Sequence, residues 1–193
     1  MVGLRKERLE EFVKWTNQHI TGDEKSQAQV FLDRLFQGFG HKGLMEAGAT
    51  LEERIKKEDS KGTAFADLVW KPYVLVEMKK RGEDLSKHYR QAFDYWVRLV
   101  PGRPQYVVLC NFDEFWIYDF NTQMDSPVDR VRIEDLPTRF GPLGFLFPTP
   151  ERPVFGDDHD HKKKDDSNLI AQLYQQIGQL KVERDFLEGS LGR

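Results

Sequence analysis

The chain has 193 residues, 39% of them hydrophobic and 12% aromatic, which is enough for one domain with a hydrophobic core plus an appendage. Its 29 basic and 32 acidic residues give a net charge of −3, which excludes a globally basic protein and confines any nucleic-acid-binding surface to a local patch. No apolar run reaches the ~18–20 residues of a transmembrane helix, no signal peptide is evident, and the single Cys110 cannot form an internal disulfide; we therefore expect a cytoplasmic protein without a membrane partner.

Two amphipathic helices are expected at the N-terminus. Apolar residues recur at helical spacing over residues 4–20, and Thr21 followed by Glu24 matches a capping box for a second helix that runs to about Phe39. Glu24 shares the spacing of the apolar residues of that second helix. Its carboxylate could therefore point towards the sheet on which the helix packs, or cap the positive helix end, and the two roles are compatible.

Three strands are expected next. Residues 38–48 are glycine-rich and predict a turn. Residues 50–57 fit a helix or an edge strand, and their short length and the turn at 60–62 favour the strand. Residues 63–79 then predict two apolar strands joined by the tight connection at 70–72.

The second of these two strands carries charge on a face that should be buried. Alternate residues share a face, so Leu75, Glu77 and Lys79 point one way. Their charges would cost several kcal/mol if they were left unpaired and dry. A hairpin brings Asp67 near Glu77, and two carboxylates so close repel unless a cation lies between them. The pattern predicts a divalent metal site with a lysine beside it; the alternative is an ion pair on a half-exposed strand.

The remaining elements complete an α/β fold with a central mixed sheet flanked by helices. A helix ended by Pro101-Gly102 supplies the crossover that a parallel strand pair requires. We expect this helix at residues 85–99, strands at 105–110, 115–120 and 131–133, and a loop over 136–150.

The composition changes after residue 150, which makes residues 1–150 the expected folded domain. Residues 151–166 predict a charged linker, because they lack any apolar period. The Asp/His alternation at 157–161 could bind metal, but a solvated linker is favoured, since nothing apolar holds such a site. Residues 167–193 predict a C-terminal extension helix with leucines near heptad spacing, suited to a helical connector or to oligomerisation.

The spacing Asp67-x9-Glu77-x-Lys79 resembles the motif of the PD-(D/E)XK (restriction-endonuclease-like) nuclease superfamily. The superfamily core has the same order of helices and strands as the one predicted here. Ala66 stands where the motif has proline, a departure that the superfamily tolerates. An acid two residues before a lysine occurs elsewhere in the chain, but only at Glu77 does it end an apolar strand with a second acid one hairpin upstream.

A closer resemblance is to the N-terminal nuclease region of MmeI-like (type IIL) restriction–modification enzymes and related phage-defence proteins. It covers roughly residues 5–135, and Gln91 and Tyr95 add the Q-x-x-x-Y motif of a subset of these nucleases. Its segments are TGDEKSQAQVFLDRLFQGFG, ADLVWKPYVLVEMKKRGEDLSKHYRQAFDYW and YVVLCNFDEFWIYDF. In that family the chain continues into a helical connector, an adenine methyltransferase and a target-recognition domain, which implies such domains in the same or a partner chain.

This resemblance implies an endonuclease that hydrolyses phosphodiester bonds of double-stranded DNA with Mg²⁺, or Mn²⁺ as a substitute. The implied direct metal ligands are Asp67, Glu77 and the Met78 backbone carbonyl. Glu24 would bind through water or hold a second ion. Lys79 would orient and activate the attacking water and stabilise the charge of the transition state.

Further residues are implied to face the DNA. Gln91 and Tyr95 would position the DNA backbone or the catalytic lysine. A local basic patch would contact phosphates, although a solvated helix face explains it equally well. The patch residues are Lys80, Arg81, Lys87 and Arg90.

Two other functions fit the same residues. One is a different PD-(D/E)XK nuclease, for DNA repair or transposon processing. The other is a non-catalytic interaction module, in which an inert nuclease fold carries the helix at 167–187. Double-strand cleavage needs two active sites, which favours a homodimer. Nothing resembles a base-reading element, so sequence specificity is expected in another domain.

Overall fold

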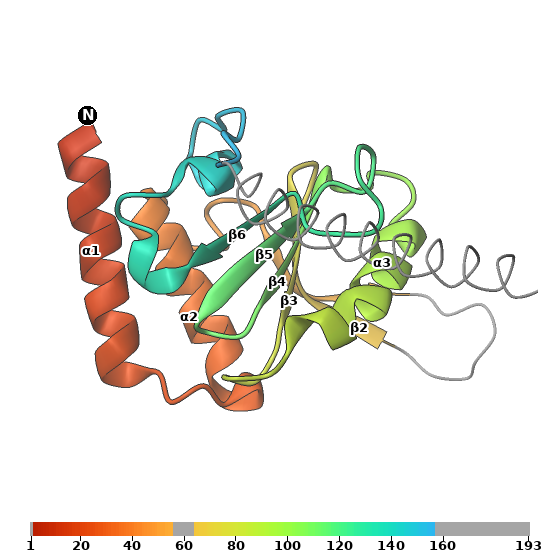
Figure 1. Cartoon of the computed structure of the whole chain (residues 1–193), viewed down its shortest axis with the longest axis horizontal. Coiled ribbons are helices and arrows are strands. Elements are labelled where there is room, and N and C mark those ends of the chain that lie inside the picture. Colours follow the sequence, from red (N-terminus) through yellow and green to blue (C-terminus); the bar gives the residue numbers. More distant parts are fainter. Residues whose placement is uncertain (1, 56–63, 157–193) are drawn as a thin grey trace, which may run out of the picture. The chain divides into compact units, whose positions relative to one another are not determined.

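A six-stranded mixed sheet forms the centre of the fold, with its strands in chain order (Figure 1). The computed structural model describes residues 2–55 and 64–156. Only β3 and β4 run parallel, and the other neighbours are antiparallel. The elements are α1 (Val2–His19), α2 (Glu24–Phe39), β1 (Thr50–Ile55), β2 (Ala64–Trp70), β3 (Val74–Met78), the 3-10 turn η1 (Leu85–His88), α3 (Tyr89–Arg98), β4 (Tyr106–Cys110), β5 (Glu114–Tyr118), β6 (Asp129–Arg132), and the 3-10 turns η2 (Ile133–Asp135) and η3 (Gly141–Leu146).

Helices cover both faces of this sheet. The helices α1 and α2 lie on one side and α3 on the other (Figure 1). On the α2 side, Phe31 belongs to the same buried cluster as Val76, whereas Trp96 of α3 shares the opposite cluster with Leu75. Val76 and Leu75 are neighbours in β3, so the expected alternation of that strand is confirmed. The α/β class, the mixed sheet and the β3–α3–β4 crossover are confirmed with it.

The cap of α2 differs from the expected capping box. Asp23, not Thr21, caps the helix, and its carboxylate accepts a hydrogen bond of 2.9 Å from the backbone N–H of Ser26. The backbone N–H and hydroxyl of Thr21 donate instead to the side chain of Gln27, at 2.9 and 3.0 Å. The prediction was wrong because aspartate caps as well as threonine does, and Gln27 already binds the N–H groups of the preceding loop.

The strands β1 and β2 both change face part-way along their length. In β2, Ala66 belongs to the cluster on the α3 side and Leu68 to the cluster on the α2 side, although residues two apart normally share a face. In β1 the same change separates Leu51 from Ile55. Glu52 lies between them with a φ of 51°, in the left-handed region. The two strands therefore bend together at one level of the sheet.

The compact unit extends to Gly156 rather than ending at residue 150. The carboxylate of Glu151 pairs with Arg5 at 2.7 Å, and the Gly156 N–H donates to the buried Asp129 at 2.8 Å. The rest of the expected linker and the extension helix at 167–193 lie outside the described residues. Among the residues described, no helix is long and apolar enough to cross a membrane.

Candidate metal and nuclease site

Three carboxylates lie at the level of the strand bend. The β1–β2 register sets Leu51 opposite Leu68, which places Glu52 opposite Asp67. The β2–β3 register also runs to Leu68, and its continuation places Asp67 opposite Glu77. Because neighbouring strands are about 4.8 Å apart, one acidic residue from each strand falls in a single row.

The Asp67 side chain fastens β2 to β3 beyond their last paired residues. Its Oδ2 accepts a hydrogen bond of 2.7 Å from the backbone N–H of Met78. Burial raises the pKa of Asp67, and the negative charges of Glu24 and Glu52 raise it further, against the lowering effects of this hydrogen bond and of Lys79. This carboxylate is thus held rigidly in acidic surroundings.

Glu77 has a buried carboxylate that is only partly satisfied. The residue is 2% exposed, and its Oε2 lies 3.4 Å from Nζ of Lys79 and 3.3 Å from Nε2 of Gln91. Its Oε1 is buried without a hydrogen-bond partner. Burial, with the nearby charge of Asp67, raises the pKa of Glu77 to about 8. An unsatisfied buried acceptor costs about 1–3 kcal/mol, which a bound cation would offset.

Lys79 joins the sheet to the start of α2. Its side chain is buried, and Nζ lies 3.9 Å from Oε1 of Glu24 in addition to its contact with Glu77. Glu24 is the first residue of α2, so the helix does direct this acid towards the sheet. Glu24 and Glu77 therefore both contact Lys79, and Asp67 lies opposite Glu77 on the neighbouring strand.

The loop before α2 is anchored by Arg81, just after β3. The backbone carbonyl of Gly22 accepts a hydrogen bond of 3.1 Å from the N–H of Arg81. The Arg81 guanidinium donates to the Ile20 carbonyl at 2.8 Å and pairs with Asp113 at 3.0 Å. These contacts hold Glu24 beside the end of β3.

Substitution of Gly22 by alanine is expected to destabilise the protein by roughly 2–4 kcal/mol. Gly22 has a φ of 95°, and an added Cβ would lie 2.2 Å from Cβ of Arg81. Gly82→Ala is the matched control, because Gly82 has a φ of 75° and open space around it, so only the backbone cost of about 1 kcal/mol remains. Urea unfolding of both variants measures the difference, and equal losses would show that the close approach is unimportant.

Gln91 and Tyr95 reach the site from α3. Nε2 of Gln91 donates to Oε2 of Glu77 and also, at 3.1 Å, to the hydroxyl of Tyr95, one helical turn further on. These hydrogen bonds join Gln91 to Glu77, the acid of the motif, rather than to Lys79. The Q-x-x-x-Y pair orients the Glu77 carboxylate from the helical side.

The donor set suits a hard divalent ion, since every charged ligand is a carboxylate. Within residues 2–55 and 64–156, no three acidic, histidine or cysteine side chains already enclose a point where an ion could sit. The residues nevertheless fit such an ion, because a buried oxygen of Glu77 lacks a hydrogen-bond partner and the nearby negative charge of Asp67 disfavours ionisation of Glu77.

Comparisons with known proteins identify the family. The description "MmeI, N-terminal domain" matches residues 4–177. The chain belongs to the family of MmeI N-terminal domains. No curated protein matches it. Among solved structures, one described as "cryoEM structure DrdV-DNA complex" is similar at 17% identity with a TM-score of 0.49; the match covers 79% of this chain and only 14% of that one.

The predicted basic patch of this MmeI N-terminal domain divides into two groups. Lys80, Lys87 and Arg90 are exposed, and Arg90 pairs loosely with Asp94 at 3.6 Å one turn along α3. Arg81 differs, because its guanidinium is bound to protein groups on two sides. The contacts of Arg81 are those of an anchor for the α2 start.

Sequence reasoning missed Glu52. It lies in an edge strand with Glu53 beside it, and alternation alone gives no reason to prefer either acid. Backbone conformation and register distinguish Glu52 from Glu53, because Glu52 has the left-handed φ and lies opposite Asp67.

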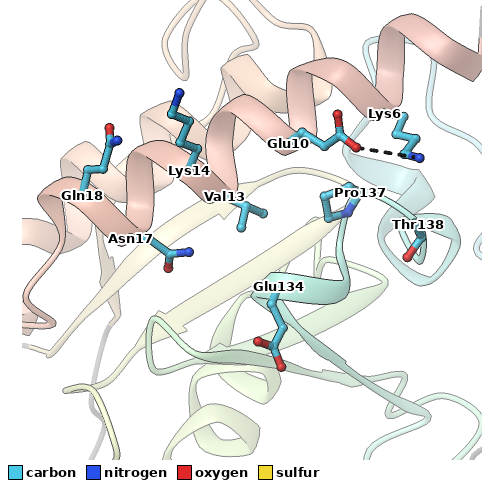
Figure 2. A pocket seen from close by; sticks show the side chains of 9 residues that line it. All are labelled: Lys6, Glu10, Val13, Lys14, Asn17, Gln18, Glu134, Pro137 and Thr138. Atoms are coloured by element: carbon cyan, nitrogen blue, oxygen red, sulfur yellow. Dashed lines mark ion pairs between the residues drawn. The ribbon is translucent and has the colours of Figure 1, made fainter.

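A separate hollow of about 570 Å³ lies between α1 and the segment 134–138 (Figure 2). Its charged lining is mixed, with Lys6 paired to Glu10 at 3.7 Å and Glu134 on the facing turn (Figure 2). None of the residues that line it is among the predicted site residues. The acidic site of this MmeI N-terminal domain is therefore distinct from this hollow.

Proposed function

We propose that this domain is a Mg²⁺-dependent DNA endonuclease with a PD-(D/E)XK core, the cleavage module of a type IIL restriction–modification or related phage-defence enzyme. The observation that carries the proposal is the buried Glu77 carboxylate with one unpartnered oxygen, 3.4 Å from the buried ammonium of Lys79 and next to Asp67. Membership in the MmeI N-terminal domain family supports it.

Asp67 and Glu77 are the residues that would hold the ion, together with the backbone carbonyl of Met78. Both carboxylates are already placed, one by the Met78 N–H and the other by Gln91. Glu24 would take part through water. When bound, Mg²⁺ would neutralise phosphate charge and lower the pKa of a water molecule.

Lys79 would orient the attacking water and stabilise the negative charge that develops on the phosphate. Its ammonium is buried, so it would act in surroundings where a charge is worth more than in water. Glu24, 3.9 Å away, holds this ammonium towards α2. Gln91 and Tyr95 keep Glu77 in place from the opposite side.

The exposed Lys80, Lys87 and Arg90 would contact phosphates of double-stranded DNA. Such contacts position a duplex without reading its sequence. Recognition would then belong to the methyltransferase and target-recognition domains, in the same or a partner chain. A homodimer would supply the second active site that cleavage of both strands requires.

The test is cleavage of supercoiled plasmid by the purified chain in Mg²⁺ or Mn²⁺. We expect nicked and linear products from the wild type and none above background from Asp67→Asn, because the variant lacks one anionic ligand. Asp125→Asn, an exposed loop acid, is the control and should cleave normally. Equal cleavage by Asp67→Asn and the wild type would contradict the proposal. A wild type that neither cleaves nor binds Mn²⁺ would favour the inert interaction module.

A further inference from the structure

Glu52 has a backbone conformation that its strand does not require. A φ of 51° places it in the left-handed region, which costs a non-glycine residue stability unless its surroundings hold it there. The register of β1 with β2 forms pairs on both sides of Glu52 and omits the pair with Asp67. The left-handed φ and the missing pair therefore both fall at Glu52, the acid of β1 that lies opposite the predicted metal ligand Asp67.

The carboxylate of Glu52 lies on the α2 side of the sheet. Its Oε1 accepts a hydrogen bond of 2.9 Å from Nε2 of Gln29, a residue of α2. Glu24, at the start of the same helix, approaches Lys79. The negative charge of Glu52 is also felt by Asp67, whose pKa it helps to raise. Glu52 is thus close to the site but tied to a neighbouring amide.

The charges of the site are unbalanced. Glu24 and Glu77 both contact the ammonium of Lys79, and Asp67, opposite Glu52 in the register, is influenced by the charges of Glu24 and of the exposed Glu52. Independently of these charges, Oε1 of Glu77 is buried without a hydrogen-bond partner, in a residue that is 2% exposed and feels the charge of Asp67. An ion pair between Lys79 and Glu77 alone would not account for the surplus of acidic groups or for the unpartnered oxygen of Glu77.

We propose that Glu52 is a further acidic residue of the cation site, held by Gln29 in this structure and transferred to the hydration shell of a divalent ion when that ion binds at Asp67 and Glu77. The inference rests on the proposed function, because it concerns the same ion. It adds a ligand from the edge strand β1 to those from β2, β3 and α2. Gln29 holds the Glu52 carboxylate by its hydrogen bond and so competes with the ion for that carboxylate.

The experiment is titration of the full chain with Mn²⁺ by calorimetry, which reads binding without any requirement for cleavage. We expect Glu52→Gln to weaken Mn²⁺ on the order of tenfold, the effect typical of outer groups around a metal. Glu53→Gln, one residue along the same strand and paired with Lys71 at 3.8 Å, is the matched control and should bind as the wild type does. Gln29→Ala should bind Mn²⁺ roughly fivefold more tightly, because the competing hydrogen bond is gone.

The outcomes separate this inference from the cleavage proposal. Equal Mn²⁺ affinity of Glu52→Gln and Glu53→Gln, with binding lost in Asp67→Asn, would overturn the role of Glu52 and leave the nuclease site intact. Weaker binding in Gln29→Ala would overturn the competition between Gln29 and the ion. A wild type that binds no Mn²⁺ would overturn both proposals at once. Thermal unfolding of each variant without metal confirms that the exposed substitutions leave the fold unchanged.

Discussion

Substitution of Lys79 by methionine is expected to lower the rate of DNA cleavage on the order of 10²–10³-fold, the effect of removing one preorganised charged donor from a dry active site. Methionine keeps most of the aliphatic stem and removes only the ammonium, which lies 3.4 Å from Glu77 and 3.9 Å from Glu24. Single-turnover cleavage of plasmid at saturating enzyme measures the chemical step apart from DNA binding.

The Lys79→Met variant should remain folded at pH 7. Removing one partner of a buried ion pair usually costs about 3–5 kcal/mol, because the other charge stays buried and alone. Here the remaining partner carries little charge at pH 7, since burial already raises the pKa of Glu77 to about 8. Lys80→Met, at the exposed neighbouring position, is the control and should weaken DNA binding without slowing cleavage at saturation. Cleavage by Lys79→Met at the wild-type rate would contradict the assigned role.

The sheet and the core of the site could be predicted because they depend on local periodicity. Strand β3 is buried on both faces, and its strict alternation sets Glu77 and Lys79 on the side opposite Val76. A short connection makes β2 its antiparallel neighbour, so the position of Asp67 follows from counting residues back along the hairpin. Both inferences require only strand geometry and a hydrophobic pattern.

The bend at Glu52 and the anchoring role of Arg81 could not be predicted in this way. The alternation rule assumes that residues two apart in a strand share a face, whereas Ala66 and Leu68 of β2 belong to clusters on opposite faces of the sheet. The contacts of Arg81 with Ile20 and Asp113 join segments far apart in the chain. A basic residue after a motif lysine predicts a phosphate contact equally well until its partners are known.

Substitution of Glu77 by glutamine is expected to make the metal-free protein more stable at pH 9 by several kcal/mol, although it removes a proposed ligand. The folded protein keeps the Glu77 proton up to a pKa of about 8, whereas the unfolded chain releases it near the ordinary glutamate pKa of 4.5. Between these two values the unfolded state binds fewer protons, so the free energy of unfolding falls as pH rises, by roughly 5 kcal/mol in total. Glutamine has no proton to lose and avoids this loss.

Urea unfolding at pH 5, 7 and 9 with a chelator present measures the effect. The wild type and Glu77→Gln should differ little at pH 5, where the carboxyl group is still largely neutral in the folded protein and the linkage has barely begun. The gap should widen up to about pH 8 and then stay constant, because above that value both states of the wild type are ionised. Glu134→Gln, at a side chain that is 67% exposed, is the control and should run parallel to the wild type. A wild type and Glu77→Gln that stay parallel across this range would contradict the raised pKa.

The Glu77 carboxyl group links the loss of stability at high pH to the proposed activity. A carboxylate that is costly to ionise in the empty site becomes favourable once a cation lies beside it, so Mn²⁺ should restore stability to the wild type at pH 8 and much less to Glu77→Gln. An ion pair with Lys79 alone predicts no Mn²⁺-dependent difference between the two proteins, because a satisfied pair would gain nothing from the ion. The difference in Mn²⁺-dependent melting temperature between the two proteins therefore distinguishes a cation site from a structural salt bridge.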